Sequence, residues 1–210
     1  MNKNKYVIRL EEKKDYWTVE NLTREAFWNV YRPGCYEHYV LHCYRERQDF
    51  VKALDFVMEI DNEIMGHVMY ARAKIELDNG RAISIMTFGP ISILPKYQRM
   101  GFGKILLDYS LEKAKELGTG AVCMEGNIDF YGKLGFVVAS TKGIHYYAEP
   151  RENVVPYFLV KELQEGFLNR IEGIYKTPDG YFVKEEDVEK FDANFPPKEK
   201  KIMPGQLWES

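Results

Sequence analysis

The stretch Gln98-Arg99-Met100-Gly101-Phe102-Gly103-Lys104 decides what kind of protein this is. It lies between a predicted strand, Ala82 to Leu94, and the most regular helical pattern of the chain, Gly103 to Leu117. Backbone N–H groups at a helix N-terminus attract anions, and glycines let a ligand approach them closely. Basic side chains in and beside the stretch add positive charge. The stretch therefore predicts a loop that binds a phosphate or a pyrophosphate.

Two well-known phosphate-binding loops are excluded at defined positions. A P-loop needs Ser or Thr after Gly-Lys, but Ile105 follows Lys104. A dinucleotide fingerprint needs a third glycine, but Leu106 stands there. The remaining pattern is Gln-x-x-Gly-x-Gly after a strand that contains Gly89-Pro90 at its centre. Because proline cannot donate to a sheet and glycine weakens pairing, that strand is expected to bulge or to part from its neighbour.

A second segment follows at a short distance. It runs from Gly126 to Phe136 and contains Phe130-Tyr131-x-x-Leu134-Gly135-Phe136. The two segments resemble motifs A and B of the GNAT superfamily of N-acetyltransferases, in the right order and with a helix and a strand between them. The resemblance covers roughly Tyr6 to Leu163. A tight turn alone explains a pair of glycines, so the second motif carries much of the weight.

The resemblance implies an α/β (α+β) fold with a mixed, mostly antiparallel central sheet, a splayed parallel pair in its middle and helices on both faces. Residues 1–163 would form the acetyltransferase domain. Residues 164–210 would form a small C-terminal extension with a hairpin, Ile171 to Tyr175 against Tyr181 to Val183, a short helix, Glu185 to Asn194, and a solvated tail, Lys198 to Lys201.

Local patterns predict the other elements. Strands are expected at Tyr6–Leu10, Leu54–Ile60, Ile64–Leu77, Ala121–Met124, Phe136–Val138 and Tyr157–Lys161, and helices at Asp15–Val30, Tyr36–Arg47 and Ile128–Leu134. The strand at Ala121 follows a crossover helix and should be parallel to the strand before that helix. Asn79-Gly80 predicts a type I′ turn.

The resemblance also implies a site for acetyl-CoA as co-substrate. Backbone groups of the bulged strand would pair with pantetheine and polarise the thioester carbonyl, and the glycine loop would hold the pyrophosphate. The predicted binding residues are Ile91, Ser92, Ile93, Gln98, Arg99, Met100, Gly101, Phe102, Gly103, Lys104, Asn127 and Tyr131. Tyr131 would protonate the departing sulfur. Glu125 is the favoured base, with Glu59 and His67 as alternatives, and for either glutamate an exposed carboxylate paired with lysine is an equally ordinary interpretation.

These assignments predict an N-acetyltransferase that moves an acetyl group from acetyl-CoA to the primary amine of a small molecule by direct attack. Aromatic residues of the first two helices and of the Lys142 to Pro156 loop would line the acceptor pocket; they include Tyr31, Tyr36, Tyr39, Tyr146 and Tyr147. Two alternatives stay open. One is a catalytically silent acyl-CoA-binding or sensor module, and the other is a nucleic-acid-binding module, which only the lysine-rich tail favours.

The composition excludes several other classes of protein. The 210 residues are 45% hydrophobic and 29% charged with a net charge of −3, which is typical of a folded domain and untypical of a nucleic-acid binder. No long apolar run or signal peptide is seen, so we expect no membrane partner and a cytoplasmic location. Three separated cysteines and four histidines without ligand spacing predict no metal, and Cys123 is expected in the core. A homodimer is compatible with the sequence.

Overall fold

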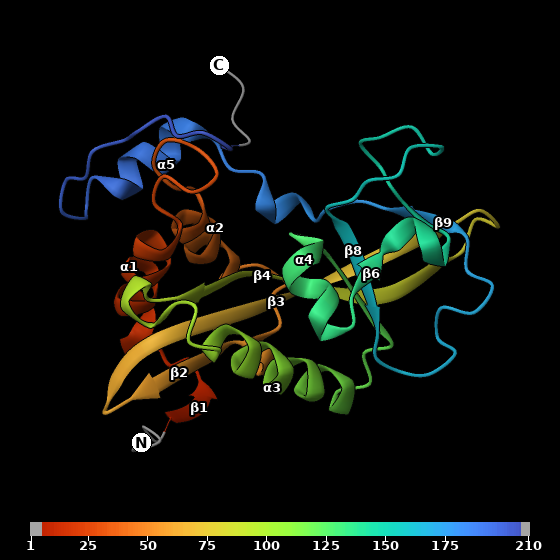
Figure 1. The fold of residues 1–210 in the computed structure, drawn as a ribbon, viewed down its shortest axis with the longest axis horizontal. Coiled ribbons are helices and arrows are strands. Elements are labelled where there is room, and N and C mark those ends of the chain that lie inside the picture. Colours follow the sequence, from red (N-terminus) through yellow and green to blue (C-terminus); the bar gives the residue numbers. More distant parts are fainter. Residues whose placement is uncertain (1–5, 207–210) are drawn as a thin grey trace. The chain divides into compact units, whose positions relative to one another are not determined.

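The computed structural model describes residues 6–206 and resolves them into two compact units (Figure 1). The first unit consists of residues 1–69, 90–107 and 179–210, and the second consists of residues 70–89 and 108–178. Two long strands and one helix run from one unit into the other, so the chain crosses between them inside regular elements. None of the helices in the described part of the chain is long and apolar enough to cross a membrane.

Nine strands are found in residues 6–206. They are β1 (Tyr6–Leu10), β2 (Phe56–Ile60), β3 (Glu63–Leu77), β4 (Ala82–Ile93), β5 (Ala121–Glu125), β6 (Val137–Val138), β7 (Ile144–Tyr146), β8 (Phe158–Glu162) and β9 (Gly173–Tyr175). Their order is β1-β2-β3-β4-β5-β8-β6, with β9 paired to both β3 and β7. Most of these strand pairs are antiparallel, whereas β4 is parallel to β5 and β7 is parallel to β9. The predicted mixed fold is therefore confirmed.

In the described part of the chain, five α-helices accompany this sheet: α1 (Tyr16–Phe27), α2 (Glu37–Tyr44), α3 (Phe102–Glu116), α4 (Ile128–Tyr131) and α5 (Glu185–Asp192). The helix predicted from Gly103 is α3, and it ends where Gly118 takes a left-handed φ of 85°, as a C-terminal glycine should. The predicted helix from Ile128 is shorter than expected, because its last turn, Gly132–Leu134, is a 3-10 turn. Short 3-10 turns are common at helix ends.

The two turns that flank β3 differ in conformation. Asp61 and Asn62 both have positive φ, 51° and 66°, so this β2–β3 turn uses the two short polar residues that tolerate the left-handed region. In the turn between β3 and β4 only Gly80 has positive φ. The predicted type I′ turn at Asn79-Gly80 is therefore wrong in type, although its position is right. The side chain of Asn79 instead accepts a hydrogen bond from the Arg81 N–H at 3.0 Å.

The C-terminal residues take part in both units. The predicted hairpin is wrong: β9 pairs with β3 and β7 rather than with Tyr181 to Val183. The predicted short helix is confirmed as α5, which lies beside α1 and α2 in Figure 1. Arg24 on α1 is fully buried and donates from two nitrogens to Asp192 on α5, at 2.6 and 3.0 Å. The domain boundary after Leu163 stays a prediction.

The tail expected in solvent is held against the end of α1. The Trp28 indole and the Asn29 amide both donate to the Glu199 carbonyl, at 2.9 and 3.0 Å. Lys198 pairs with Glu25 at 2.8 Å. The sequence shows only a run of lysines here, whereas the side chains that donate to this segment lie about 170 positions earlier in the chain.

Candidate active site

The predicted phosphate loop has left-handed residues directly before a helix N-terminus. It leaves β4 through a 3-10 turn, Pro95–Tyr97, and residues 98–101 are exposed. Arg99 and Gly101 have left-handed φ values of 59° and 90°. The first helical hydrogen bond of α3 runs from the Ile105 N–H to the Gly101 carbonyl at 3.2 Å. Left-handed residues next to a helix N-terminus turn successive N–H groups toward one point, which favours an anion there.

The two glycines of this loop have different reasons to be glycine. Gly101 needs its positive φ. Gly103 lies in the first turn of α3 without positive φ, and a Cβ added there would meet only the Ile93 Cγ1 atom, at an ordinary 3.7 Å. The fold therefore has no need for glycine at position 103, and glycine costs a helix about 1 kcal/mol relative to alanine. A ligand that comes close to this backbone would explain it.

The basic side chains near the loop are not equivalent. Both Glu63 carboxylate oxygens hold the Lys96 ammonium at 2.7 Å, so its charge is largely neutralised. Arg99 and Lys104 are exposed on the loop and at the start of α3. Gln98 has a structural role, because its amide donates to the Ile93 carbonyl at 2.9 Å and so connects the loop to the end of β4.

The segment Ile91 to Ile93 lies at the end of β4 in the first unit. Ser92 is buried, and its hydroxyl donates to Thr23 Oγ1 at 3.1 Å, so its side chain faces the interior. Ile91 and Ile93 are half-buried. Just before them, Gly89 has a φ of 136°, a backbone conformation that favours glycine. The distortion predicted for the centre of this strand is therefore present.

In the second unit, Glu125 ends β5 as predicted and is exposed. One of its oxygens, Oε1, accepts hydrogen bonds from the Tyr146 and Thr177 hydroxyls, both at 2.8 Å. These two hydroxyls are 3.2 Å apart. Sequence reasoning missed Thr177, which lies 52 positions after Glu125 in a segment without any motif.

The Tyr131 ring packs against Gly126, the residue that follows Glu125. A Cβ added to Gly126 would lie 2.5 Å from the Tyr131 ring, so the ring lies directly on this backbone. The ring also packs against Phe88, Phe130 and Phe136, with centroid distances of 6.0, 4.9 and 5.7 Å. Asn127 caps α4, because its side-chain oxygen accepts from the Asp129 N–H at 2.7 Å.

The two alternative bases are engaged elsewhere. Glu59 accepts a hydrogen bond from Arg9 Nε at 3.0 Å. His67 is fully buried and lies 2.8 Å from Asp55 through its Nε2 atom. Burial lowers the pKa of His67 to about 4, so its neutral form is favoured near neutral pH. Of the three candidate bases, Glu125, Glu59 and His67, only Glu125 is exposed.

His67 belongs to a buried cluster with Glu11 and Asp55, whose ligand atoms lie within 4.8 Å of one another. Burial raises the pKa of Glu11 to about 7 and that of Asp55 to about 6. Arg45 donates to both oxygens of Glu11, at 2.9 and 2.7 Å. A carboxylate–histidine set of this kind has the donors for a metal ion, but the guanidinium already supplies the positive charge that these carboxylates need.

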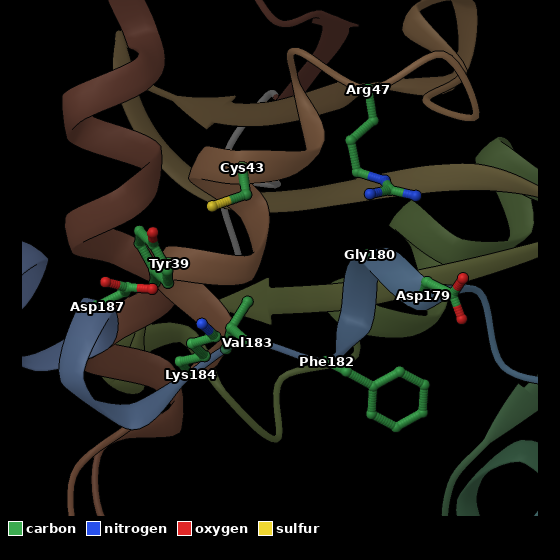
Figure 2. A pocket seen from close by; sticks show the side chains of 9 residues that line it. All are labelled: Tyr39, Cys43, Arg47, Asp179, Gly180, Phe182, Val183, Lys184 and Asp187. Atoms are coloured by element: carbon green, nitrogen blue, oxygen red, sulfur yellow. The ribbon is translucent and has the colours of Figure 1, made fainter.

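A pocket of about 390 Å³ lies in the first unit (Figure 2). Its lining residues are Tyr39, Cys43, Arg47, Asp179, Gly180, Phe182, Val183, Lys184 and Asp187. Arg47 and Asp179 lie on one side of the view, and Tyr39, Cys43 and Asp187 lie on the other. Of the aromatic residues predicted to line the acceptor pocket, Tyr39 lines this one, whereas none of the predicted catalytic or cofactor-binding residues does.

Comparisons with known proteins identify the family and the fold. The model of the acetyltransferase (GNAT) family matches residues 23–136. The uncharacterized N-acetyltransferase YjhQ of Escherichia coli is 28% identical over 86 residues, which are 40% of this chain and 46% of that protein. An N-alpha-acetyltransferase of Sulfurisphaera tokodaii is 28% identical over 124 residues, which are 54% of this chain and 73% of that protein. The chain thus spans about half of the first relative and about three quarters of the second.

Solved structures share the fold over most of the chain. The N-acetyltransferase YhbS of Escherichia coli, in complex with CoA, has a TM-score of 0.73 at 21% identity and covers 86% of this chain and 94% of its own. A Brucella melitensis acetyltransferase in complex with acetyl-CoA has a TM-score of 0.66 at 21% identity and covers 85% and 99%. At this identity the likeness concerns the fold. Because the family model matches more than half of its residues, the chain belongs to the acetyltransferase (GNAT) family.

Proposed function

We propose that the protein is an acyl-CoA-dependent N-acetyltransferase that transfers an acetyl group from acetyl-CoA to the primary amine of a small molecule. The observation that carries this proposal is Gly103. It occupies the first turn of a long helix, where neither φ nor crowding requires glycine. A ligand phosphate at this helix N-terminus supplies the missing reason. Family membership makes the pyrophosphate of acetyl-CoA the ligand that fits.

In this proposal different segments bind different parts of acetyl-CoA. The backbone from Arg99 to Lys104 surrounds the pyrophosphate, and Gln98 supports that backbone from behind through the Ile93 carbonyl. The backbone of Ile91 to Ile93 pairs with the pantetheine amides and polarises the thioester carbonyl. Met100 and Phe102 contribute backbone N–H groups to the pyrophosphate site, because both lie within the segment from Arg99 to Lys104.

The proposed reaction is direct attack without an acyl-enzyme. The neutral amine nitrogen forms a bond to the thioester carbon, and the carbon–sulfur bond breaks. Tyr131 gives its phenolic proton to the departing sulfur, and Glu125 takes a proton from the amine, directly or through water. Tyr131 suits this role because four neighbours hold its ring in one place: the Gly126 backbone and three phenylalanines. Asn127 caps the helix that carries it.

The test is a thiol-release assay with acetyl-CoA and a panel of primary amines, run beside a thermal-shift titration with CoA. The proposal expects CoA to raise the melting temperature and at least one amine to release thiol above the hydrolytic background. A thermal shift without thiol release for any amine identifies the alternative, an acyl-CoA-binding module without turnover. No shift and no release would refute both.

A further inference from the structure

Glu125 is a carboxylate without a cationic partner. Within residues 6–206 no lysine, arginine or histidine forms an ion pair with it, and its two hydrogen bonds come from neutral hydroxyls, Tyr146 and Thr177. Both reach the same oxygen, Oε1, so the described residues offer no hydrogen bond to Oε2. The two hydrogen bonds to Oε1 therefore fix the orientation of the side chain, while Oε2 remains available to a ligand.

The tyrosine that contacts this carboxylate, Tyr146, belongs to a cluster of aromatic rings. The Tyr146 ring lies edge-on to the rings of Tyr147 and Tyr157, with centroids 5.2 and 6.1 Å away. Tyr147 is 40% exposed and Tyr157 is 44% exposed, so part of each ring is accessible to a ligand. The Gly126 N–H donates to the Tyr157 carbonyl at 2.8 Å, so the backbone next to Glu125 holds Tyr157 in place.

A second carboxylate, Glu149, and a pocket lie next to Tyr157. Glu149 lines a pocket of about 250 Å³ together with Asn153, Val154, Val155, Pro156 and Tyr157. Burial, together with the charges of Glu149 and Glu125, raises the pKa of Tyr157, which places its phenol within range of both carboxylates. Apart from Glu149, the pocket is lined by neutral side chains, and no basic residue is among them.

We propose that Glu125, Tyr146, Tyr147 and Tyr157 form a subsite for an organic ammonium ion, and that this subsite selects cationic alkylamines as acceptors. This inference rests on the proposed function. Ring faces attract ammonium groups by cation–π interaction, and a carboxylate adds an ion pair. The apolar wall of the pocket, formed by Val154, Val155 and Pro156, accommodates the alkyl part of such an amine. An acceptor with a carboxylate beside its amine is disfavoured, because Glu125 and Glu149 repel it.

Tetramethylammonium is a suitable probe, because it is a cation that has no N–H and cannot be acetylated. Its binding to the wild-type protein, followed by changes in the tyrosine signals in NMR, should be saturable. Glu125→Gln keeps the side-chain shape and removes the charge, and it should weaken binding at least tenfold. Tyr157→Leu removes a ring and should weaken it several-fold. The matched control is Glu165→Gln, which removes an exposed carboxylate of the same unit and should bind as the wild type does.

A second arm uses turnover. Tetramethylammonium should raise the KM for an alkylamine acceptor without changing kcat, and Glu125→Gln should abolish this competition. If CoA binds and an amine releases thiol, but tetramethylammonium neither binds nor competes, the subsite is refuted and the proposed function stands. If tetramethylammonium binds in a manner that depends on Glu125 but no amine is acetylated, the subsite stands and the proposed function fails. Equal binding by wild type and Glu125→Gln would also refute the subsite.

Discussion

Gly103→Asp tests the proposed pyrophosphate site without weakening the fold. The new Cβ would meet only the Ile93 Cγ1 atom at 3.7 Å, and the backbone there has no positive φ, so aspartate fits as the chain stands. The position lies in the first turn of α3, where a negative side chain stabilises a helix by about 0.3–1 kcal/mol. The melting temperature of the ligand-free protein should therefore stay the same or rise.

The effect on the ligand should be large. Two unit charges about 5 Å apart repel by roughly 3 kcal/mol at an effective dielectric constant of about 20. A cost of this size raises Kd by about a hundredfold. At a CoA concentration of a hundred times the wild-type Kd, bound ligand stabilises the fold by about 2.7 kcal/mol. The variant should lose most of this stabilisation, down to about 0.4 kcal/mol when Kd has risen to the ligand concentration.

The assay is a thermal-shift titration with CoA on wild type, Gly103→Asp and a matched control. Gly80→Asp is that control: Gly80 has a φ of 79°, faces open space, and lies in the turn between β3 and β4. It should lower the melting temperature of the free protein, because aspartate is strained there, and leave the CoA shift intact. A full CoA shift in Gly103→Asp would show that the ligand does not approach this helix N-terminus, and the loop would no longer be the site.

The remaining predictions concern catalysis and stability. Tyr131→Phe keeps the ring packing and should lower kcat about a hundredfold with little change in CoA affinity; wild-type kcat would assign the leaving-group proton to another donor. Glu125→Gln should lower kcat/KM most near neutral pH and recover partly at high pH, where free amine is abundant; a loss equal at every pH would mean that it only anchors the acceptor. Burial raises the pKa of Glu11 from 4.5 to about 7, so its contribution to stability is present below pH 4.5 and is lost as pH rises to about 7; urea unfolding of Glu11→Gln over this range should remove that part of the pH dependence, and an unchanged profile would contradict it. Asp192→Ala leaves the buried Arg24 charge unpaired and should lower the free energy of unfolding by about 3 kcal/mol in urea titrations, whereas a change below about 1 kcal/mol would mean that solvent reaches the guanidinium.

The sequence alone determined the features that depend on neighbours along the chain. The α3 helix, its C-terminal Gly118 and the β2–β3 turn follow from periodicity and from the conformations that glycine, aspartate and asparagine tolerate. The two glycine motifs were sufficient to indicate the family. Such features can be predicted from the sequence because their main determinants lie within a few residues of one another.

Tertiary structure alone decided what depends on residues far apart in sequence. Thr177 and Tyr146 reach Glu125 from 52 and 21 positions away, and no local pattern marks them as its partners. The same holds for β9, which leaves its predicted hairpin because it pairs with β3 and β7 instead. Hydrogen-bond donors and strand edges find partners across the whole fold, and which partner is nearest is known only once the chain is packed.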